Sequence, residues 1–156
     1  VYRMRWSILT IASVLALAYV MNFSGQTVAM GTFLAGLGPV YAILAPALGW
    51  IGTAVTGSDT SANALFSKLQ VSAAENLHQA GISGATPELL LAANTTGGVV
   101  GKMISPQSLA IAATSVDMEG KESDILKAVV PWSFAMLVVV CILVFLQTNV
   151  LSFLIP

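Results

Sequence analysis

The chain has 156 residues, of which 56% are hydrophobic and only 8% charged, whereas soluble domains average roughly 25% charged residues. Residues 6–58 contain no charge, and six of the 13 charges cluster at 117–127. The formal net charge of −1 excludes the basic surface of a nucleic-acid-binding protein. A single cysteine, Cys141, excludes an intrachain disulfide and a cysteine-rich metal site. Charges confined to the ends of apolar stretches predict an all-α, polytopic membrane protein embedded in a lipid bilayer.

The first apolar stretch, residues 6–23, follows a start that has neither a methionine nor a signal-peptide pattern. We therefore expect residues 1–156 to form a single transmembrane region of a chain truncated at its N-terminus. About 18 residues at 1.5 Å rise each approach the roughly 30 Å hydrocarbon core, so residues 6–23 predict a first span. Polar residues 22–26 end it. Residues 27–55 exceed one straight span and predict either a long kinked helix or two shorter pieces.

The middle of the chain contains clear helix boundaries. Ser58 or Asp59 is suited to cap a helix that continues to about residue 79, because short oxygen side chains satisfy the first free N–H groups. Pro87 suits the first position of the next helix. We expect this helix to be interrupted after Asn94 and to restart at Ser105, with an end near residue 115. Residues 117–127 predict a hydrophilic connection.

The last span is expected to begin at Pro131 and to end near Ile155. Its orientation follows from the lysine and arginine residues. Arg3 and Arg5 favour a cytoplasmic start of the chain, and Lys121 and Lys127 favour a cytoplasmic connection before the last span. The C-terminus is then expected on the outer side.

Two polar segments interrupt the apolar sequence: the first polar segment, 57–63, and the second polar segment, 94–108. Paired helix breaks of this kind indicate a transporter's binding site, and each segment precedes a helix N-terminus, which attracts anions. Lys102 adds a positive charge, so the segments together predict a receptor for a small carboxylate. The expected substrate-binding residues are Ser58, Thr60, Ser61, Asn63, Asn94, Thr95, Thr96, Gly97, Gly98, Lys102, Ser105, Gln107 and Ser108.

Other interpretations of these residues are structural. The spacing of Gly97 and Gly101 also fits close helix packing, and the serines and threonines also fit simple caps. Asp59 is a candidate for proton coupling, because ionisable groups within membrane segments are functional by default. It also fits a helix cap or an ion pair with Lys102 or Lys68. The sequence contains no catalytic triad, paired carboxylates or histidine spacing typical of a metal site, so we expect no enzyme activity, cofactor or metal.

Several short stretches resemble the L-lactate permease family, in order and with plausible spacing. They are Met21–Gly25, Leu48–Trp50, Thr56–Ser61, Asn63–Phe66, Leu69–Val71 and Gly101–Ser108. The resemblance covers residues 22–122, and the last three residues are similar to the family's C-terminus. Ala62, Thr95 and Thr96 are small departures from the family's motifs and bear on substrate choice.

The resemblance implies a bacterial or archaeal plasma-membrane carrier that imports L-lactate and related 2-hydroxy monocarboxylates, such as glycolate and D-lactate, together with protons. It also implies the C-terminal half of an inverted-repeat transporter of the ion transporter superfamily. In that fold, residues 57–63 form the tip of a re-entrant helical hairpin, and residues 95–105 unwind a broken helix.

We therefore expect a secondary active transporter. The alternatives are a carrier of another small organic or inorganic anion, such as a dicarboxylate or sulfate, and a passive channel or structural membrane subunit. A shared substrate site requires the first polar segment to lie on the order of 10 Å from the second, with a polar pocket between them.

Overall fold

The computed structural model describes residues 5–82 and 84–151, and every regular element in these two ranges is helical. The elements in chain order are α1 (Arg5–Phe23), α2 (Gln26–Ala35), α3 (Val40–Thr56), α4 (Asp59–Gln79), α5 (Pro87–Gly101), the 3-10 turn η2 (Lys102–Ile104), α6 (Pro106–Ser115) and α7 (Glu122–Asn149).

The helix expected at residues 6–23 is present as α1, and the polar break after it turns the chain sharply. Gly25 has a φ of 75°, a left-handed conformation that glycine adopts without steric cost. Residues Ile11–Phe23 and Gln26–Ala35 are bent by 71° relative to each other. Together α1 and α2 are long and apolar enough for a broken span or a re-entrant loop.

Residues 27–55 form two pieces rather than one long kinked helix. A turn at 36–39 separates α2 from α3, and Gly38 in this turn has a φ of 62°. Pro46 lies inside α3 without ending it. Gly57, with a φ of 72°, then reverses the chain, and Ser58 caps α4 as expected. The tip of the α3–α4 hairpin is therefore confined to Gly57 and Ser58, and residues 59–63 already belong to α4.

The expected unwinding of the second polar segment is largely wrong. Helix α5 continues through residues 95–101, and only Lys102–Ile104 and Ser105 depart from α-helix. Close packing explains why a glycine-rich stretch stays helical. A Cβ on Gly97 would overlap the carbonyl oxygen of Pro46, and one on Gly101 would overlap that of Trp50. The glycines thus allow α3 and α5 to touch backbone to backbone, which offsets their weak helix propensity.

The predicted start of the last span is also wrong. Helix α7 begins at Glu122 and contains Pro131 in its interior. The carboxylates of Glu122 and Asp124 in the first turn favour an early start, because they interact well with the positive end of the helix dipole. The helix ends at Asn149, and the predicted end at Ile155 lies outside the described residues. Among the described helices, α7 alone is long and apolar enough to cross a membrane by itself.

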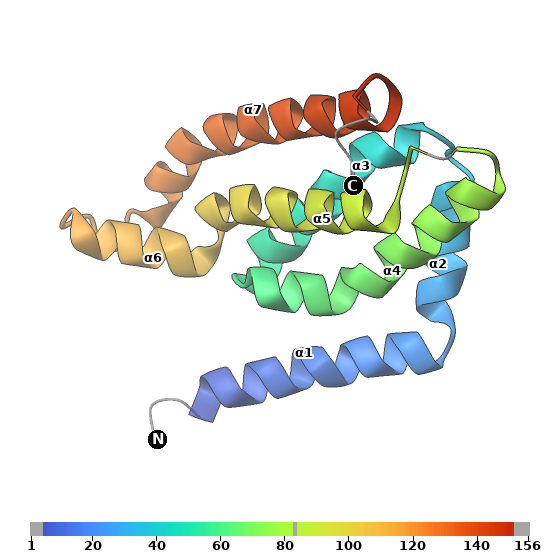
Figure 1. The fold of residues 1–156 in the computed structure, drawn as a ribbon. Coiled ribbons are helices and arrows are strands. Elements are labelled where there is room, and N and C mark those ends of the chain that lie inside the picture. Colours follow the sequence, from blue (N-terminus) through green and yellow to red (C-terminus); the bar gives the residue numbers. More distant parts are fainter. Residues whose placement is uncertain (1–4, 83, 152–156) are drawn as a thin grey trace.

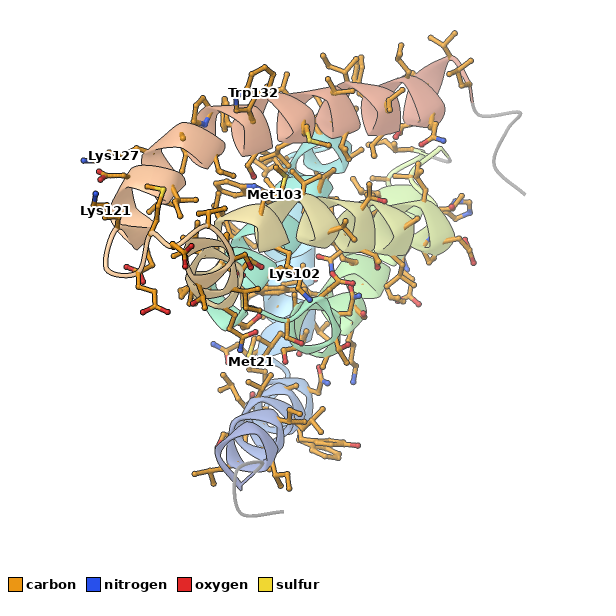
Figure 2. All side chains as sticks on the ribbon, turned by 90° about the vertical axis from the view of Figure 1, so that its left-hand side faces the viewer. Met21, Lys102, Met103, Lys121, Lys127 and Trp132 are labelled. Carbon is orange, nitrogen blue, oxygen red and sulfur yellow. The ribbon has the colours of Figure 1, made fainter. Side chains whose placement is uncertain are left out.

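Helices α3, α4 and α5 pack around a common core, in which Tyr41, Leu69, Leu77 and Leu90 are fully buried. Figure 1 shows α1 and α7 on opposite sides of this core. Both helices expose many large apolar side chains, of which Trp132 on the outer face of α7 is 71% exposed (Figure 2). Such exposure fits contact with lipid or with further protein.

Both α1 and α7 begin at the same end of the molecule (Figure 1). Lys121 and Lys127 lie together at this end, next to the α6–α7 corner (Figure 2). Lys121 precedes α7 and Lys127 lies in its second turn, while the orientation of the chain in the membrane stays a prediction. Arg3 itself lies outside the described residues.

Candidate functional site

A chain of hydrogen-bonded side chains passes through the core and joins the two polar segments. The hydroxyl of Tyr41 on α3 donates to Oε1 of Gln70 on α4 at 2.6 Å. Nε2 of Gln70 donates to Oδ1 of Asn94 on α5 at 3.2 Å, and Nδ2 of Asn94 donates to Oδ1 of Asn63 at 2.7 Å. Nδ2 of Asn63 donates to Oδ2 of Asp59 at 3.2 Å. We call these five side chains the polar chain.

Every hydrogen bond of the polar chain points toward Asp59. An ionised carboxylate only accepts hydrogen bonds, so Asn63 turns its amide NH2 to Asp59 and its oxygen to Asn94. Gln70 has its own constraint, because its Nε2 also donates to the carbonyl oxygen of Ala45 at 3.3 Å. Asn63 and Gln70 are thus each held in one orientation, and together they determine which way the side-chain amide of Asn94 points.

The first polar segment begins α4 and also lies against α1. The hydroxyl of Ser58 accepts the backbone N–H of Ser61 at 3.3 Å, an ordinary N-cap. Ser58, Thr60 and Ser61 line a cavity of about 210 Å³ whose other wall is formed by apolar residues of α1. These three predicted site residues therefore face α1 rather than the second polar segment.

The N-terminus of α6 lies close to the N-terminus of α4. Ser105 caps α6, and its hydroxyl accepts the backbone N–H of Ser108 at 3.4 Å. The side chain of Gln107 lies against Gly57, where an added Cβ would come within 2.9 Å of the side-chain amide carbon. Two helix N-termini thus converge at the α3–α4 corner, and each is a suitable place for an anion.

Lys102 lies beside these two helix ends. It follows α5 directly, its side chain is exposed, and it is the cation whose charge acts on the Asp59 carboxyl. Figure 2 places Lys102 apart from Lys121 and Lys127. The only salt bridge among the described residues joins Lys127 to Asp124 at 3.9 Å, so neither Lys102 nor Lys68 forms one with Asp59.

The residues of the second polar segment have three different surroundings: the polar chain, the protein surface and the contact between α5 and α3. Asn94 is fully buried, and the hydroxyl of Thr95 reaches Oδ1 of Asn63 at 3.2 Å. Thr96 is exposed, and its hydroxyl donates to the carbonyl oxygen of Ala92 in its own helix. Gly97 packs on α3, which supports the structural interpretation for this residue. Gly98 lies next to the Asp59 carboxyl.

Three residues that sequence reasoning missed take part in this site: Tyr41, Gln70 and Thr53. Gln70 could have been found from its spacing, because residues 59, 63 and 70 share one face of a helix. Tyr41 and Thr53 offer no such signal, since both lie within an apolar helix. Thr53 is fully buried, and its Oγ1 faces Gly98 together with Oδ1 of Asp59.

An all-helical fold with a long apolar span, exposed apolar faces and a buried polar chain beside converging helix ends fits a membrane protein of the transporter class. The model of the L-lactate permease family matches residues 1–151. The chain belongs to this family.

Two L-lactate permeases are similar over nearly the whole chain. The one from Bacillus subtilis (strain 168) is 47% identical over 156 residues, which are 100% of this chain and 27% of the relative. The one from Escherichia coli (strain K12) is 46% identical over 149 residues, 96% of this chain and 26% of the relative. The glycolate permease GlcA of Escherichia coli (strain K12) is 43% identical over 149 residues, again 96% and 26%.

The chain thus spans about a quarter of the length of these relatives. No solved structure matches it.

Proposed function

We propose that residues 1–156 are the C-terminal part of a secondary active transporter that imports L-lactate, glycolate and D-lactate by proton symport. The proposed location is the bacterial or archaeal plasma membrane. Because the chain spans about a quarter of its relatives, we propose that it forms part of one half of an inverted-repeat fold. The names of the relatives support lactate and glycolate as substrates. The observation that carries the proposal is the meeting of the two polar segments through Asn63 and Asn94, next to Asp59 and Lys102.

The proposed receptor for the substrate carboxylate combines the N-termini of α4 and α6 with Lys102. Helix N-termini offer unpaired N–H groups and a partial positive charge, and Lys102 offers a full charge that no described carboxylate neutralises through a salt bridge. One lysine and two helix ends suit a monocarboxylate better than a dicarboxylate. The substrate hydroxyl is proposed to bond to the polar side chains of the same corner, among which are Thr95 and Gln107.

Asp59 is the proposed proton carrier. It begins α4, it terminates the polar chain, and its carboxyl lies within the field of Lys102. Protonation removes the negative charge that competes with the substrate for Lys102. Binding of the proton then increases the affinity for the substrate anion, and binding of the anion increases the affinity for the proton, which is the coupling that symport requires.

Transport by the complete permease in proteoliposomes tests this function. An inwardly directed proton gradient should drive saturable uptake of radiolabelled L-lactate, and a protonophore should abolish accumulation. Unlabelled glycolate and D-lactate should compete. Competition by sulfate or a dicarboxylate instead would indicate a carrier of another anion. A flux that neither saturates nor responds to the gradient would indicate a channel.

A further inference from the structure

Two buried oxygen atoms face the same glycine and lack a hydrogen-bond partner among the described residues. They are Oγ1 of Thr53, in the last turn of α3, and Oδ1 of Asp59, at the start of α4. A Cβ on Gly98 would overlap Oδ1 and would lie 2.8 Å from Oγ1. Both oxygens therefore approach α5 at Gly98, where no side chain stands between them and the helix backbone. An unpartnered buried oxygen is costly, and the Thr53 side chain is a hydrogen-bonding neighbour of the Asp59 carboxyl, so a turn of the Thr53 hydroxyl pairs the two oxygens with each other.

The other carboxylate oxygen of Asp59 is already engaged. Oδ2 accepts the hydrogen bond of Asn63, and the polar chain behind Asn63 cannot reverse, because Gln70 must donate to the carbonyl oxygen of Ala45. A proton placed on Oδ2 would face the amide NH2 of Asn63, donor against donor. Oδ1 is consequently the oxygen that is available to a proton.

We propose that Oδ1 of Asp59 and Oγ1 of Thr53 form the binding site of the coupling proton, an inference that rests on the proton-coupled transport proposed above. A lone pair of Oδ1 forms an O–H bond with a proton from a hydronium ion, which leaves as water, and the carboxylate becomes a neutral carboxyl. The new O–H then donates to Oγ1. After the proton leaves, the Thr53 hydroxyl turns and donates to Oδ1, since a hydroxyl is both donor and acceptor.

The surroundings favour a proton over a metal cation. Among the residues that the structure describes, two unpartnered oxygens face Gly98, whereas a metal cation takes several oxygen ligands. Lys102 is the charged group that acts on Asp59, and its positive charge repels a second full cation. Helices α3 and α6, which meet at this corner, contain no charged residue. Thr53 is thus a positioning residue, and it acts through its hydroxyl on the proton held by Asp59.

The test compares Thr53→Val with Thr53→Ser in the complete permease, reconstituted in proteoliposomes. Valine keeps the shape of threonine and removes the hydroxyl, whereas serine keeps the hydroxyl. Hydrogen bonds to ionised groups are roughly twice as strong as neutral ones, so valine destabilises the ionised form of Asp59 more than the protonated form. The pH at which uphill uptake falls to half should therefore rise by about 0.5 unit, a threefold change in proton affinity. Thr53→Ser should keep the wild-type profile.

Lactate–lactate exchange at fixed pH serves as the control for folding and substrate binding, and it should persist in both variants. An unshifted profile in Thr53→Val, with normal exchange, would overturn the proton site. A Thr53→Ser profile that follows valine would overturn it as well, because the hydroxyl would then be irrelevant. Uptake that requires sodium in place of a proton gradient would also contradict the inference. If wild-type permease shows no proton-driven lactate uptake, the proposed function itself fails.

Discussion

The substitution Gln70→Leu should destabilise the protein more than any change at the surface of the same helix. Gln70 is fully buried and makes three hydrogen bonds, with the Tyr41 hydroxyl, the Ala45 carbonyl and Asn94. Leucine fills a similar volume but bonds to none of them. The Tyr41 hydroxyl and Oδ1 of Asn94 are then left buried and unpartnered.

The expected loss follows from these two orphaned groups. Each unsatisfied buried group costs about 1–3 kcal/mol, and measured hydrogen bonds in membrane proteins lie toward or below the lower end of that range. We therefore expect Gln70→Leu to lower the free energy of unfolding by about 2–4 kcal/mol. Adding Tyr41→Phe removes one orphaned group, so the double variant should recover about 1 kcal/mol relative to the sum of the single changes.

Equilibrium unfolding in detergent, followed by tryptophan fluorescence, measures this difference. Gln79→Leu is the matched control, since Gln79 is an exposed glutamine in the same helix, and it should stay within about 0.5 kcal/mol of wild type. A Gln70→Leu protein as stable as the control would refute the polar chain as a source of stability. Simple additivity of the Tyr41 and Gln70 changes would refute their coupling.

Three further outcomes are expected of the complete permease. Lys102→Ala should abolish L-lactate uptake without loss of the protein from the membrane, whereas Lys121→Ala should retain uptake; normal transport in the Lys102 variant would exclude the proposed receptor. Asp59→Asn should lose uphill uptake but keep lactate–lactate exchange in a counterflow assay, and loss of both would argue against a pure proton carrier. Gly97→Ala should cost about 1–3 kcal/mol in detergent unfolding because its methyl group meets the α3 backbone, whereas Thr96→Ala should be nearly neutral.

The helix boundaries that depend on local chemistry could be predicted from the sequence. Ser58 and Ser105 cap helices because their hydroxyls accept free N–H groups within three residues, and Pro87 starts a helix because it lacks a donor that the position does not need. Each of these helix boundaries depends on residues within one helical turn of it. Neighbouring residues alone are sufficient to indicate them.

The boundaries that depend on distant residues were predicted wrongly. The glycines of α5 look like a break, because nothing nearby in the sequence shows that α3 will press on them. Pro131 looks like a start, yet α7 passes through it, and the helix is continuous from Glu122. In both cases residue types that weaken a helix are tolerated where packing or the surrounding medium stabilises it.

The candidate site shows the same division between local and distant causes. The sequence places Asp59 and Asn63 on one helix face, but the position of Thr53 relative to them depends on how closely α3 approaches α5. Gly49, Gly97 and Gly101 set that approach, since a Cβ at any of them would overlap a carbonyl oxygen of the facing helix. Gly97 and Gly101, which belong to the second polar segment, therefore set the distance between the helices: together with Gly49 they bring α3 close enough to α5 for Thr53 and Asp59 to face Gly98.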